Sequence, residues 1–444
     1  MKNILVIGAG RSTVSLIGYL LENAATHNWQ ITVADMSLDL AKSKTIGYPQ
    51  AIAIQLDIDN KEERLKEIQK ADFVISMLPA FMHLPVIKDC VSLGKHVATA
   101  SYVSSEMQAL DAEAKKKNIL LLNECGLDPG IDHASAMKVI DEVQGKGGEI
   151  ISFKSYCGGL VAPESNDNPW GYKFSWNPRN VVVAGQATAQ YLENGEIKYI
   201  PYNRIFTQTD TIEVDGFKYD AYANRDSLSY IHPYKLDMAK TILRGTLRQT
   251  DYCKAWNVFV KLGLTDDTFT IKDTDTKTYT QLLQSFLPNK AGSVKQNLID
   301  FMGKEADAEC ITMIEWLGFF DSVKIELRQG TPAQLLQYLL EKKWLLKPND
   351  KDLVVMQHQF EIDNSKNGSI PKRIVSSLVV TGTDQHHTAM AKTVGLPLAI
   401  SVKNFLTGKF NLTGVQIPIN KEIYHPLLQE LEQHGICFKE EHIA

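Results

Sequence analysis

Short apolar runs alternate with amphipathic stretches along the N-terminal part of the chain. The runs that predict strands are Asn3–Ile7, Gln30–Ala34, Ala51–Leu56, Phe73–Met77, His96–Ala98 and Ile119–Leu122. Helices are predicted to begin near Ser12, Leu38, Glu62, Leu84 and Ser105, the last running to Lys116. Strands that alternate with helices pair in parallel through right-handed crossovers. The pattern therefore predicts an α/β fold whose first domain, residues 1–128, is a doubly wound, Rossmann-type parallel sheet.

Beyond residue 128 the pattern is less regular. A helix is predicted over Ala134–Val143, and two strands should form a hairpin over Val354–Ile362 and Arg373–Val380. Leucines recur at helical spacing in TYTQLLQSFL, SVKQNLIDFM and PAQLLQYLLEKKW. The expected further parts are a mixed α/β substrate and dimerisation domain (129–235 plus about 350–384), a mostly helical insertion (236–349), and part of 385–444 completing the first domain.

Composition and charge exclude several functional classes. The 444 residues include 47 basic and 52 acidic side chains, a net charge of −5, so no footprint for nucleic acid or an anionic membrane is expected. The six cysteines form no CxxC pair, which argues against a disulfide framework or a zinc site. No apolar stretch approaches the ~20 residues of a membrane-spanning helix, and the N-terminal apolar run is too short for a signal peptide. We expect a cytoplasmic protein with reduced thiols.

A glycine-rich loop follows the first predicted strand. Gly8 and Gly10 stand at the first two glycine positions of a GxGxxG pattern, and Thr13 replaces the third glycine. Such a loop lets backbone N–H groups approach a pyrophosphate at a helix N-terminus. Asp35 follows the second strand, where a carboxylate accepts hydrogen bonds from ribose hydroxyls and repels a 2′-phosphate. The pattern favours NAD; the alternative role of Asp35 is a cap for the following helix.

Polar loops also follow the later strands. Ligands of open α/β sheets bind at the carboxyl ends of the strands. Such turns also need Ser, Asp and Pro for structural reasons, and position alone does not separate the two interpretations. If these loops bind a cofactor, the residues that line it are expected to be Gly8, Gly10, Arg11, Ser12, Thr13, Asp35, Leu56, Asp57, Ser76, Met77, Leu78 and Ala100, with Ser101 and Tyr102 beside them.

Two long segments after the sixth strand are candidates for the reaction site. NECGLDPGIDH (Asn123–His133) carries two carboxylates and a histidine, and SYCGGLVAPESNDNPWGYKFSW (Ser155–Trp176) is rich in polar and aromatic residues. Long loops of this kind usually build a site. His133 has no HxxxH-type partner, so no metal is predicted.

Three arginines suggest a substrate with several carboxylates. Arg225 lies in the loop ANRDS, and Arg244 and Arg248 in ILRGTLRQ are predicted to lie one turn apart on the edge of a helix. Arginines capture carboxylates through paired hydrogen bonds. The alternative is that each is an ordinary surface arginine.

These motifs together resemble those of the saccharopine dehydrogenases of the L-glutamate-forming type. The resemblance runs through GAG, ISMLP, SYVSSEM, NECGLDPGIDHA, SYCGGLVAPESNDNPWGYKFSW, ANRDS, ILRGTLR and the terminal KEEHIA, essentially the whole chain. It implies the reversible, nicotinamide-dependent interconversion of saccharopine with 2-aminoadipate 6-semialdehyde and L-glutamate, in lysine metabolism. It also implies that these small molecules are the partners, and that the protein is a homodimer.

The resemblance implies roles for individual residues. Tyr102, Asp128 and Cys157 would be the polar groups nearest the reacting carbon, with Asp128 the first choice as acid–base group. Substrate-binding residues would be Ser101, Tyr102, Asp128, Arg225, Arg244, Thr246 and Arg248. Leu127, Asp128, Pro129 and Ser175 would join the cofactor-binding set.

The chain departs from the family pattern at two places. NADP-using fungal members carry Cys-Arg-Thr where this chain has Asp35-Met36-Ser37, so NAD is preferred and NADP, which Arg11 could assist, is the alternative. Arg204–Ala221 follows the pattern poorly and receives no role. Other hypotheses are a carboxynorspermidine dehydrogenase or related imine reductase, which would lack the arginine set, and a non-catalytic cofactor-binding protein.

Overall fold

The computed structural model describes residues 1–184, 186–288, 291–305 and 307–443, and the chain divides into two compact units. Met1–Gly147 and Leu378–Lys439 form the first unit, and Gly148–Ser377 with Glu440–Ala444 form the second. A domain boundary at residue 128 and a separate helical domain over 236–349 are expected from the sequence; in the structure the first unit extends to Gly147, and 236–349 belongs to the second unit.

The first unit contains a seven-stranded sheet in the order β17-β6-β5-β4-β1-β2-β3, and all its strand pairs are parallel. The strands are β1 (Lys2–Ile7), β2 (Trp29–Asp35), β3 (Ala51–Gln55), β4 (Phe73–Ser76), β5 (His96–Thr99), β6 (Leu120–Leu122) and β17 (Gly414–Gln416). The strand order reverses between β1 and β4, which is where such sheets bind ligands. The predicted α/β fold with a doubly wound parallel sheet is confirmed.

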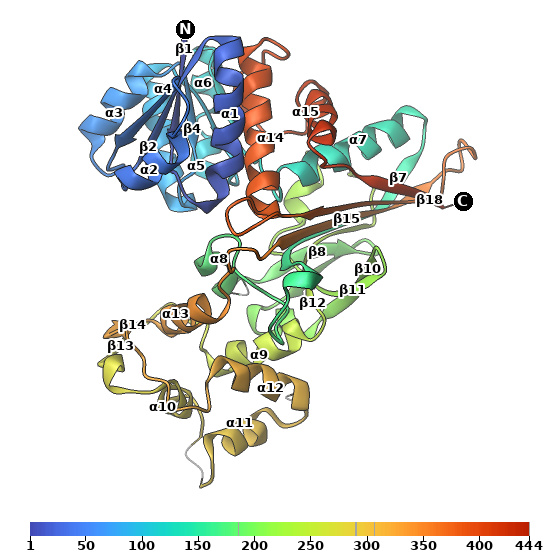
Figure 1. Cartoon of the computed structure of the whole chain (residues 1–444). Helices are drawn as coiled ribbons and strands as arrows, with labels where there is room; N and C mark the ends of the chain where they lie inside the picture. Colours follow the sequence, from blue (N-terminus) through green and yellow to red (C-terminus); the bar gives the residue numbers. More distant parts are fainter. Residues whose placement is uncertain (185, 289–290, 306, 444) are drawn as a thin grey trace. The chain divides into compact units, whose positions relative to one another are not determined.

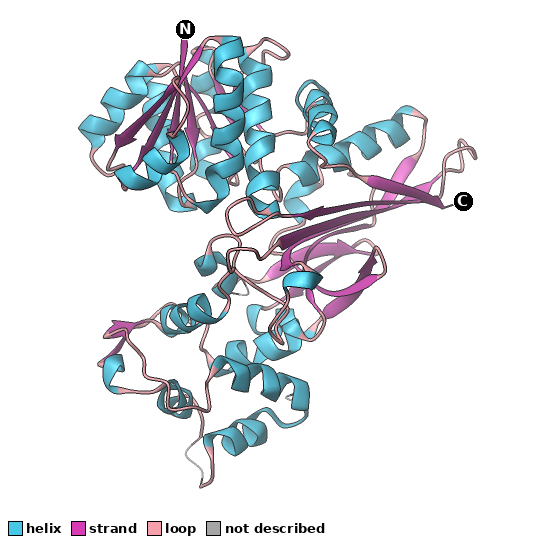
Figure 2. Ribbon diagram, in the orientation of Figure 1, coloured by secondary structure: helices cyan, strands magenta, loops and turns pink. Residues whose placement is uncertain are grey.

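Helices lie on both faces of this sheet (Figure 2). The helices of the first unit are α1 (Val14–His27), α2 (Leu38–Thr45), α3 (Lys61–Lys70), α4 (His83–Leu93), α5 (Ser105–Gln108), α6 (Asp111–Lys116), α7 (Ile131–Gly145), α14 (Ala389–Leu406) and α15 (Lys421–Gln433). Side chains of Ser37, Asn60 and Ser104 cap the N-termini of α2, α3 and α5. The single helix predicted over 105–116 is divided into α5 and α6. In the described part of the chain, no helix is both long and apolar enough to cross a bilayer.

Residues far apart in the sequence complete the first unit. Helix α14 lies along α1 (Figure 1), and a Cβ atom added to Gly395 would come within 2.8 Å of the Leu16 backbone nitrogen. The absence of a side chain at Gly395 therefore allows the two helix backbones to approach closely. β17 extends the sheet beside β6, with Gly414 in register with Leu120.

A nine-stranded mixed sheet belongs largely to the second unit. Its order is β10-β11-β12-β7-β15-β16-β18, with the hairpin of β8 and β9 attached through β12. The strands are β7 (Glu149–Val161), β8 (Ala189–Glu193), β9 (Glu196–Ile200), β10 (Thr209–Val214), β11 (Phe217–Ala223), β12 (Thr241–Gln249), β15 (Asp352–Asp363), β16 (Arg373–Thr381) and β18 (Lys439–Ile443). β15 and β16 are neighbours, as the predicted hairpin requires.

Two apolar clusters flank this sheet. One contains Tyr156 and Leu247, whose side chains share a face of β7 and β12. The other is a large aromatic and aliphatic cluster that includes the fully buried Trp170, Trp256 and Trp344. The helices of this region are α8 (Pro178–Val182), α9 (Tyr252–Leu262), α10 (Tyr279–Ser285), α11 (Val294–Met302), α12 (Ala308–Leu317) and α13 (Pro332–Lys343), beside the small sheet of β13 (Ile271–Lys272) and β14 (Gln329–Gly330).

Two expectations for the second unit need revision. ILRGTLRQ was predicted as helical, but it forms β12, which is paired on both sides by β7 and β11. The unassigned segment 204–221 contributes β10 and most of β11, an antiparallel pair at one edge of the sheet. The helical region therefore starts at α9 rather than at residue 236.

Candidate functional site

The glycine-rich loop of the first unit connects β1 to α1 through a short 3-10 turn. Gly8 has a φ of +105°, and a Cβ atom there would lie 2.7 Å from the Met77 carbonyl oxygen, so only glycine fits. A Cβ atom on Gly10 would meet nothing within 4 Å. The chain itself does not require glycine at position 10, whereas a pyrophosphate approaching the backbone would. Thr13, at the third glycine position, is buried and donates to the Gly10 carbonyl at 2.8 Å.

Asp35 lies at the carboxyl end of β2, and its carboxylate accepts hydrogen bonds from two different loops. Its Oδ2 accepts from the Ala9 backbone N–H at 2.7 Å, and its Oδ1 accepts from the Ser37 N–H at 2.9 Å. The carboxylate is therefore fixed beside the glycine-rich loop. Met36 is 61% exposed, and Arg11 is also exposed. The helix cap suggested as an alternative is provided by the Ser37 side chain instead, which accepts from the Leu40 N–H.

The other residues predicted to contact the cofactor lie at the same edge of the parallel sheet. Each group follows the carboxyl end of a strand: Leu56 and Asp57 after β3, Ser76, Met77 and Leu78 at β4, Ala100, Ser101 and Tyr102 after β5, and Leu127, Asp128 and Pro129 after β6. Ser76 and Leu56 are buried, and Met77 and Ala100 are half-buried. Because the strands are parallel, these loops and the glycine-rich loop form one continuous rim.

Tyr102 and Asp128 meet on this rim. The Tyr102 hydroxyl donates to Asp128 Oδ1 at 3.3 Å, although the two residues follow different strands. Glu124 ties the loops together, because its Oε1 accepts from the Val103 N–H at 2.9 Å and its Oε2 lies 2.8 Å from His133 Nε2. Two of the three groups predicted nearest the reacting carbon are thus in contact.

Glycines and buried polar groups shape the loop that carries Asp128. A Cβ atom on Gly130 would overlap the Gly126 backbone at 2.1 Å, so the chain crosses itself closely there. His133 is fully buried and contacts Glu124, so it has a structural role in this loop. Within the residues that the structure describes, no three His, Cys, Asp or Glu side chains are grouped to hold a metal ion.

In the second unit, β12 presents a polar row. Arg244, Thr246 and Arg248 alternate along the strand and therefore share one face. Cys157 on β7 is in register with Thr246, so its side chain points to the same face. Four residues singled out from the sequence are thus neighbours on one sheet surface, although the helix predicted for Arg244 and Arg248 is wrong.

Arg248 is enclosed by aromatic rings. Its guanidinium carbon lies 5.3, 5.7 and 5.5 Å from the ring centroids of Tyr172, Tyr222 and Tyr252, and the residue is only 4% exposed. Nη1 donates to the Leu247 carbonyl at 2.9 Å, but the buried Nε has no hydrogen-bond partner. Among the described residues no carboxylate forms an ion pair with this guanidinium. A buried cation of this kind favours binding of an external anion.

The other two arginines differ from Arg248 and from each other. Arg244 is buried, and its guanidinium lies 4.1 Å from the ring centroid of Tyr230. Arg225 is exposed in the loop after β11, with a φ of +40° that non-glycine residues rarely adopt. Its carbonyl accepts from the Gln190 N–H at 2.7 Å, which helps to hold this turn. The three arginines are therefore one exposed loop residue and two buried strand residues.

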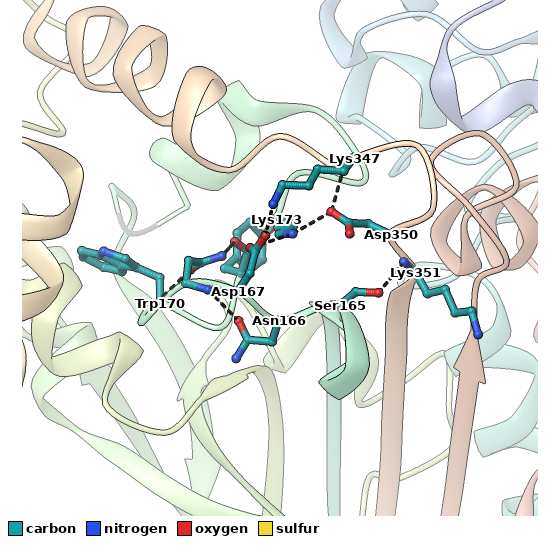
Figure 3. A network of polar contacts seen from close by, with 10 residues as sticks. Ser165, Asn166, Asp167, Trp170, Lys173, Lys347, Asp350 and Lys351 are labelled. Atoms are coloured by element: carbon teal, nitrogen blue, oxygen red, sulfur yellow. Dashed lines mark hydrogen bonds and ion pairs between the residues drawn. The ribbon is translucent and has the colours of Figure 1, made fainter.

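The loop between β7 and α8 is anchored by a buried lysine. Lys173 is 2% exposed, and its Nζ lies 2.6 Å from Asp350 and 2.8 Å from Asp167 (Figure 3). Lys347 also pairs with Asp167, and these hydrogen-bonded ion pairs lower the pKa of Asp167 to about 2. Ser175 follows Lys173 by two residues. Its hydroxyl is buried and has no hydrogen-bond partner in the structure.

Comparison with known proteins identifies the family. Residues 4–122 match the model described as Saccharopine dehydrogenase NADP binding domain, and residues 126–436 match Saccharopine dehydrogenase C-terminal domain. The NADP(+), L-glutamate-forming saccharopine dehydrogenase of Pyricularia oryzae is 37% identical over 454 residues, covering 100% of this chain and 99% of that protein. The chain belongs to the saccharopine dehydrogenase family.

Two further members support this assignment. The NADP(+), L-glutamate-forming saccharopine dehydrogenase of Saccharomyces cerevisiae is 35% identical over 453 residues, with 100% of both chains covered. The solved apo saccharopine dehydrogenase (L-Glu forming) from Saccharomyces cerevisiae has a TM-score of 0.88 at 33% identity, again with 100% coverage of both chains. The likeness therefore extends over both units.

A nicotinamide cofactor fits the first unit of this family member. The open space above Gly10 and the fixed carboxylate of Asp35 suit the pyrophosphate and the adenosine ribose of such a cofactor. The matched residues 4–122 end just before the loop that carries Asp128. A role for His83, which lies in this region between Ser76 and Ser101, was not predicted from the sequence.

Proposed function

We propose that this protein is an L-glutamate-forming saccharopine dehydrogenase, which interconverts saccharopine with 2-aminoadipate 6-semialdehyde and L-glutamate in lysine metabolism. The observation that carries this proposal is the buried, carboxylate-free guanidinium of Arg248 in a chain similar over its full length to enzymes named for this reaction. Saccharopine has three carboxylates, and a dehydrated arginine is a strong partner for one of them.

In the reductive direction the glutamate amine adds to the aldehyde carbon, and the carbinolamine loses water to give an imine. A nicotinamide cofactor, when bound, would supply the hydride for the imine carbon, and a proton would complete the secondary amine. The remaining steps are proton transfers, so the site needs a positioned acid–base group more than a nucleophile.

Asp128 is the proposed acid–base group. Its carboxylate accepts from the Tyr102 hydroxyl at 3.3 Å, and both groups stand in loops at the carboxyl ends of the parallel strands. Tyr102 is 41% exposed and thus reachable by a substrate. Cys157 has the smaller proposed role of lining the site, because its buried side chain lies beside Thr246 on the sheet.

The proposed carboxylate-binding residues are Ser101, Arg225, Arg244, Thr246 and Arg248. Arg248 supplies a buried charge, and Arg244 is held by the ring of Tyr230. Arg225 is the exposed member and can move its guanidinium with little cost in desolvation. This set favours a substrate with several carboxylates over the single-carboxylate polyamine that a carboxynorspermidine dehydrogenase would bind.

The proposed cofactor preference is NAD(H). The named relatives use NADP(+) and so favour NADP; the basis for NAD is Asp35, whose fixed carboxylate would face a 2′-phosphate dianion. Like charges at such short range cost more than an exposed Arg11 recovers. Ser175, with its unpartnered buried hydroxyl, is proposed to contact the cofactor.

The decisive experiment is a steady-state assay of the purified protein with saccharopine and either NAD or NADP, following reduced cofactor at its absorbance band and glutamate by a coupled assay. Equal amounts of glutamate and reduced cofactor would support the proposal. Turnover of carboxynorspermidine but not of saccharopine would favour the other imine reductase, and cofactor binding without turnover of either would show a non-catalytic protein.

A further inference from the structure

A buried histidine connects two of the strand-end loops in the first unit. His83 is 1% exposed at the start of α4; its Nδ1 lies 2.8 Å from Ser76 Oγ and its Nε2 lies 2.7 Å from Ser101 Oγ. Ser76 ends β4 and Ser101 follows β5, so the imidazole bridges neighbouring strand ends. The Thr99 hydroxyl lies beside the ring at longer distances, 3.5 Å from Nδ1 and 3.4 Å from Nε2, and accepts from the Ser101 backbone N–H at 3.3 Å.

The protonation state of the histidine follows from its environment. Burial lowers the pKa of His83 to about 4, so the ring is neutral near pH 7 and has one N–H donor and one bare nitrogen. Of the two serine hydroxyls that contact the ring, one must therefore donate to it and the other must accept from it.

The burial of Ser76 decides which serine donates to the ring and which accepts from it. The Ser76 side chain is fully buried, and His83 Nδ1 is the only acceptor for its hydroxyl among the described residues. A buried hydroxyl without an acceptor is unfavourable, so Ser76 donates to Nδ1. The proton of the ring is then on Nε2, which donates to Ser101.

This arrangement leaves the Ser101 hydroxyl hydrogen unused. Ser101 accepts from Nε2–H, and its hydroxyl forms no other hydrogen bond with the residues that the structure describes. Ser101 is only half-buried, so a ligand can reach it. A hydroxyl whose oxygen is already an acceptor is held with its hydrogen outward, which suits a carboxylate and not an ammonium group.

We propose that His83 is a positioning residue, which acts through Ser101 by fixing its hydroxyl as a donor to a substrate carboxylate. This inference rests on the proposed function. Neither His83 nor this donor relationship follows from the sequence motifs, because His83 lies in the apolar stretch AFMHLP rather than in a strand-end loop.

Two substitutions of His83 test the hydrogen bonds of its two ring nitrogens separately. The amide of asparagine at position 83 reaches the place of Nδ1 and keeps the contact with Ser76, whereas the amide of glutamine reaches the place of Nε2 and keeps the donor to Ser101. We expect His83→Asn to raise the KM for saccharopine by about 5- to 10-fold with kcat within about 2-fold, a loss typical of one hydrogen bond. His83→Gln should restore the KM to within about 2-fold of the parent.

Ser101→Ala and a control histidine complete the test. In the Ser101→Ala background, His83→Asn should raise the KM no further, since the effect is transmitted through Ser101. His96→Asn changes a half-buried histidine at the opposite end of β5 and should leave the KM unchanged. Thermal unfolding shows which variants fold, and the NADH affinity of those that fold should equal that of the parent within error.

The outcomes distinguish this inference from the function on which it rests. Absence of saccharopine turnover by the parent protein overturns both. Turnover with equal KM values for His83→Asn and His83→Gln, or additive effects of His83→Asn and Ser101→Ala, overturns the inference alone. Nitrogen-15 NMR of labelled histidine in the parent protein tests it without any variant at position 83: a bare Nδ1 with Nε2–H supports it, and the opposite tautomer overturns it.

Discussion

The carboxylate of Asp35 accepts a hydrogen bond from the backbone N–H of Ala9 at 2.7 Å, so the end of β2 is fixed to the glycine-rich loop. A second bond from the Ser37 N–H, at 2.9 Å, holds the other carboxylate oxygen. The position of a negative charge beside this loop is thus set by the backbone. Any cofactor bound there must accommodate it.

The first prediction concerns cofactor choice. The kcat/KM with NAD should exceed that with NADP, because a carboxylate near a phosphate dianion costs several kcal/mol. Exchange of Asp35→Ser together with Met36→Arg should move the preference toward NADP, since Met36 is exposed and an arginine there can reach solvent-facing phosphate. Initial rates with both cofactors give the ratio. A parent protein at least as efficient with NADP would show that Asp35 does not decide the preference.

The second prediction concerns the acid–base group. Asp128→Asn should lower kcat by about 10²-fold or more while NADH affinity stays nearly unchanged. Tyr102→Phe removes the 3.3 Å hydrogen bond to Asp128 and should have a smaller effect, and Cys157→Ala should cost least. Single-turnover rates and fluorescence titration of NADH provide the measurements. If Asp128→Asn keeps turnover within a few-fold of the parent, another group carries the proton.

The third prediction concerns substrate carboxylates. Arg248→Met keeps most of the apolar stem among the tyrosines but removes the charge, and should raise the KM for saccharopine by about 10- to 100-fold. NADH affinity should not change. Arg204→Met, at an exposed position in the same unit, serves as the control. Equal losses for saccharopine and NADH would mean that Arg248 supports the fold instead.

The fourth prediction concerns the buried lysine of the second unit. Lys173→Met removes the partner of Asp350 and leaves a poorly solvated carboxylate, which should lower the free energy of unfolding by about 3 kcal/mol. Lys347→Met removes a largely exposed partner of Asp167 and should cost at most about 1 kcal/mol. Urea unfolding monitored by tryptophan fluorescence compares them. Similar costs for both substitutions would argue against a special role for burial at Lys173.

The fifth prediction concerns pH and stability. Because burial lowers the pKa of His83 to about 4 from 6.5, the unfolded chain binds a proton between these values and the folded chain does not. The free energy of unfolding should therefore fall as pH drops from 6.5 toward 4, by at most about 1.4 kcal/mol per pH unit from this residue. His83→Gln should flatten this slope relative to His425→Gln, which removes an exposed histidine. Unchanged slope in His83→Gln would locate the acid sensitivity elsewhere.

The sequence by itself determined the parallel sheet of the first unit and the loops that follow its strands. Gly8, Gly10 and Asp35 could be recognised because the local spacing of apolar, glycine and capping residues predicts a strand, a tight turn and the start of a helix. The rim of loops followed in turn, since parallel strands place their carboxyl ends at one edge.

Only the tertiary structure showed the strand that carries two of the arginines, the aromatic surroundings of Arg248 and the contacts of His83. Arg244 and Arg248 were assigned to a helix because β12 is covered on both faces, so its sequence lacks the alternation of a half-buried strand. The aromatic enclosure of Arg248 joins β11, β12, α9 and a distant loop, and no local pattern encodes such a meeting. His83 was missed for the same reason: a buried histidine acquires its partners from Ser76 and Ser101 only when neighbouring strands bring them to both ring nitrogens.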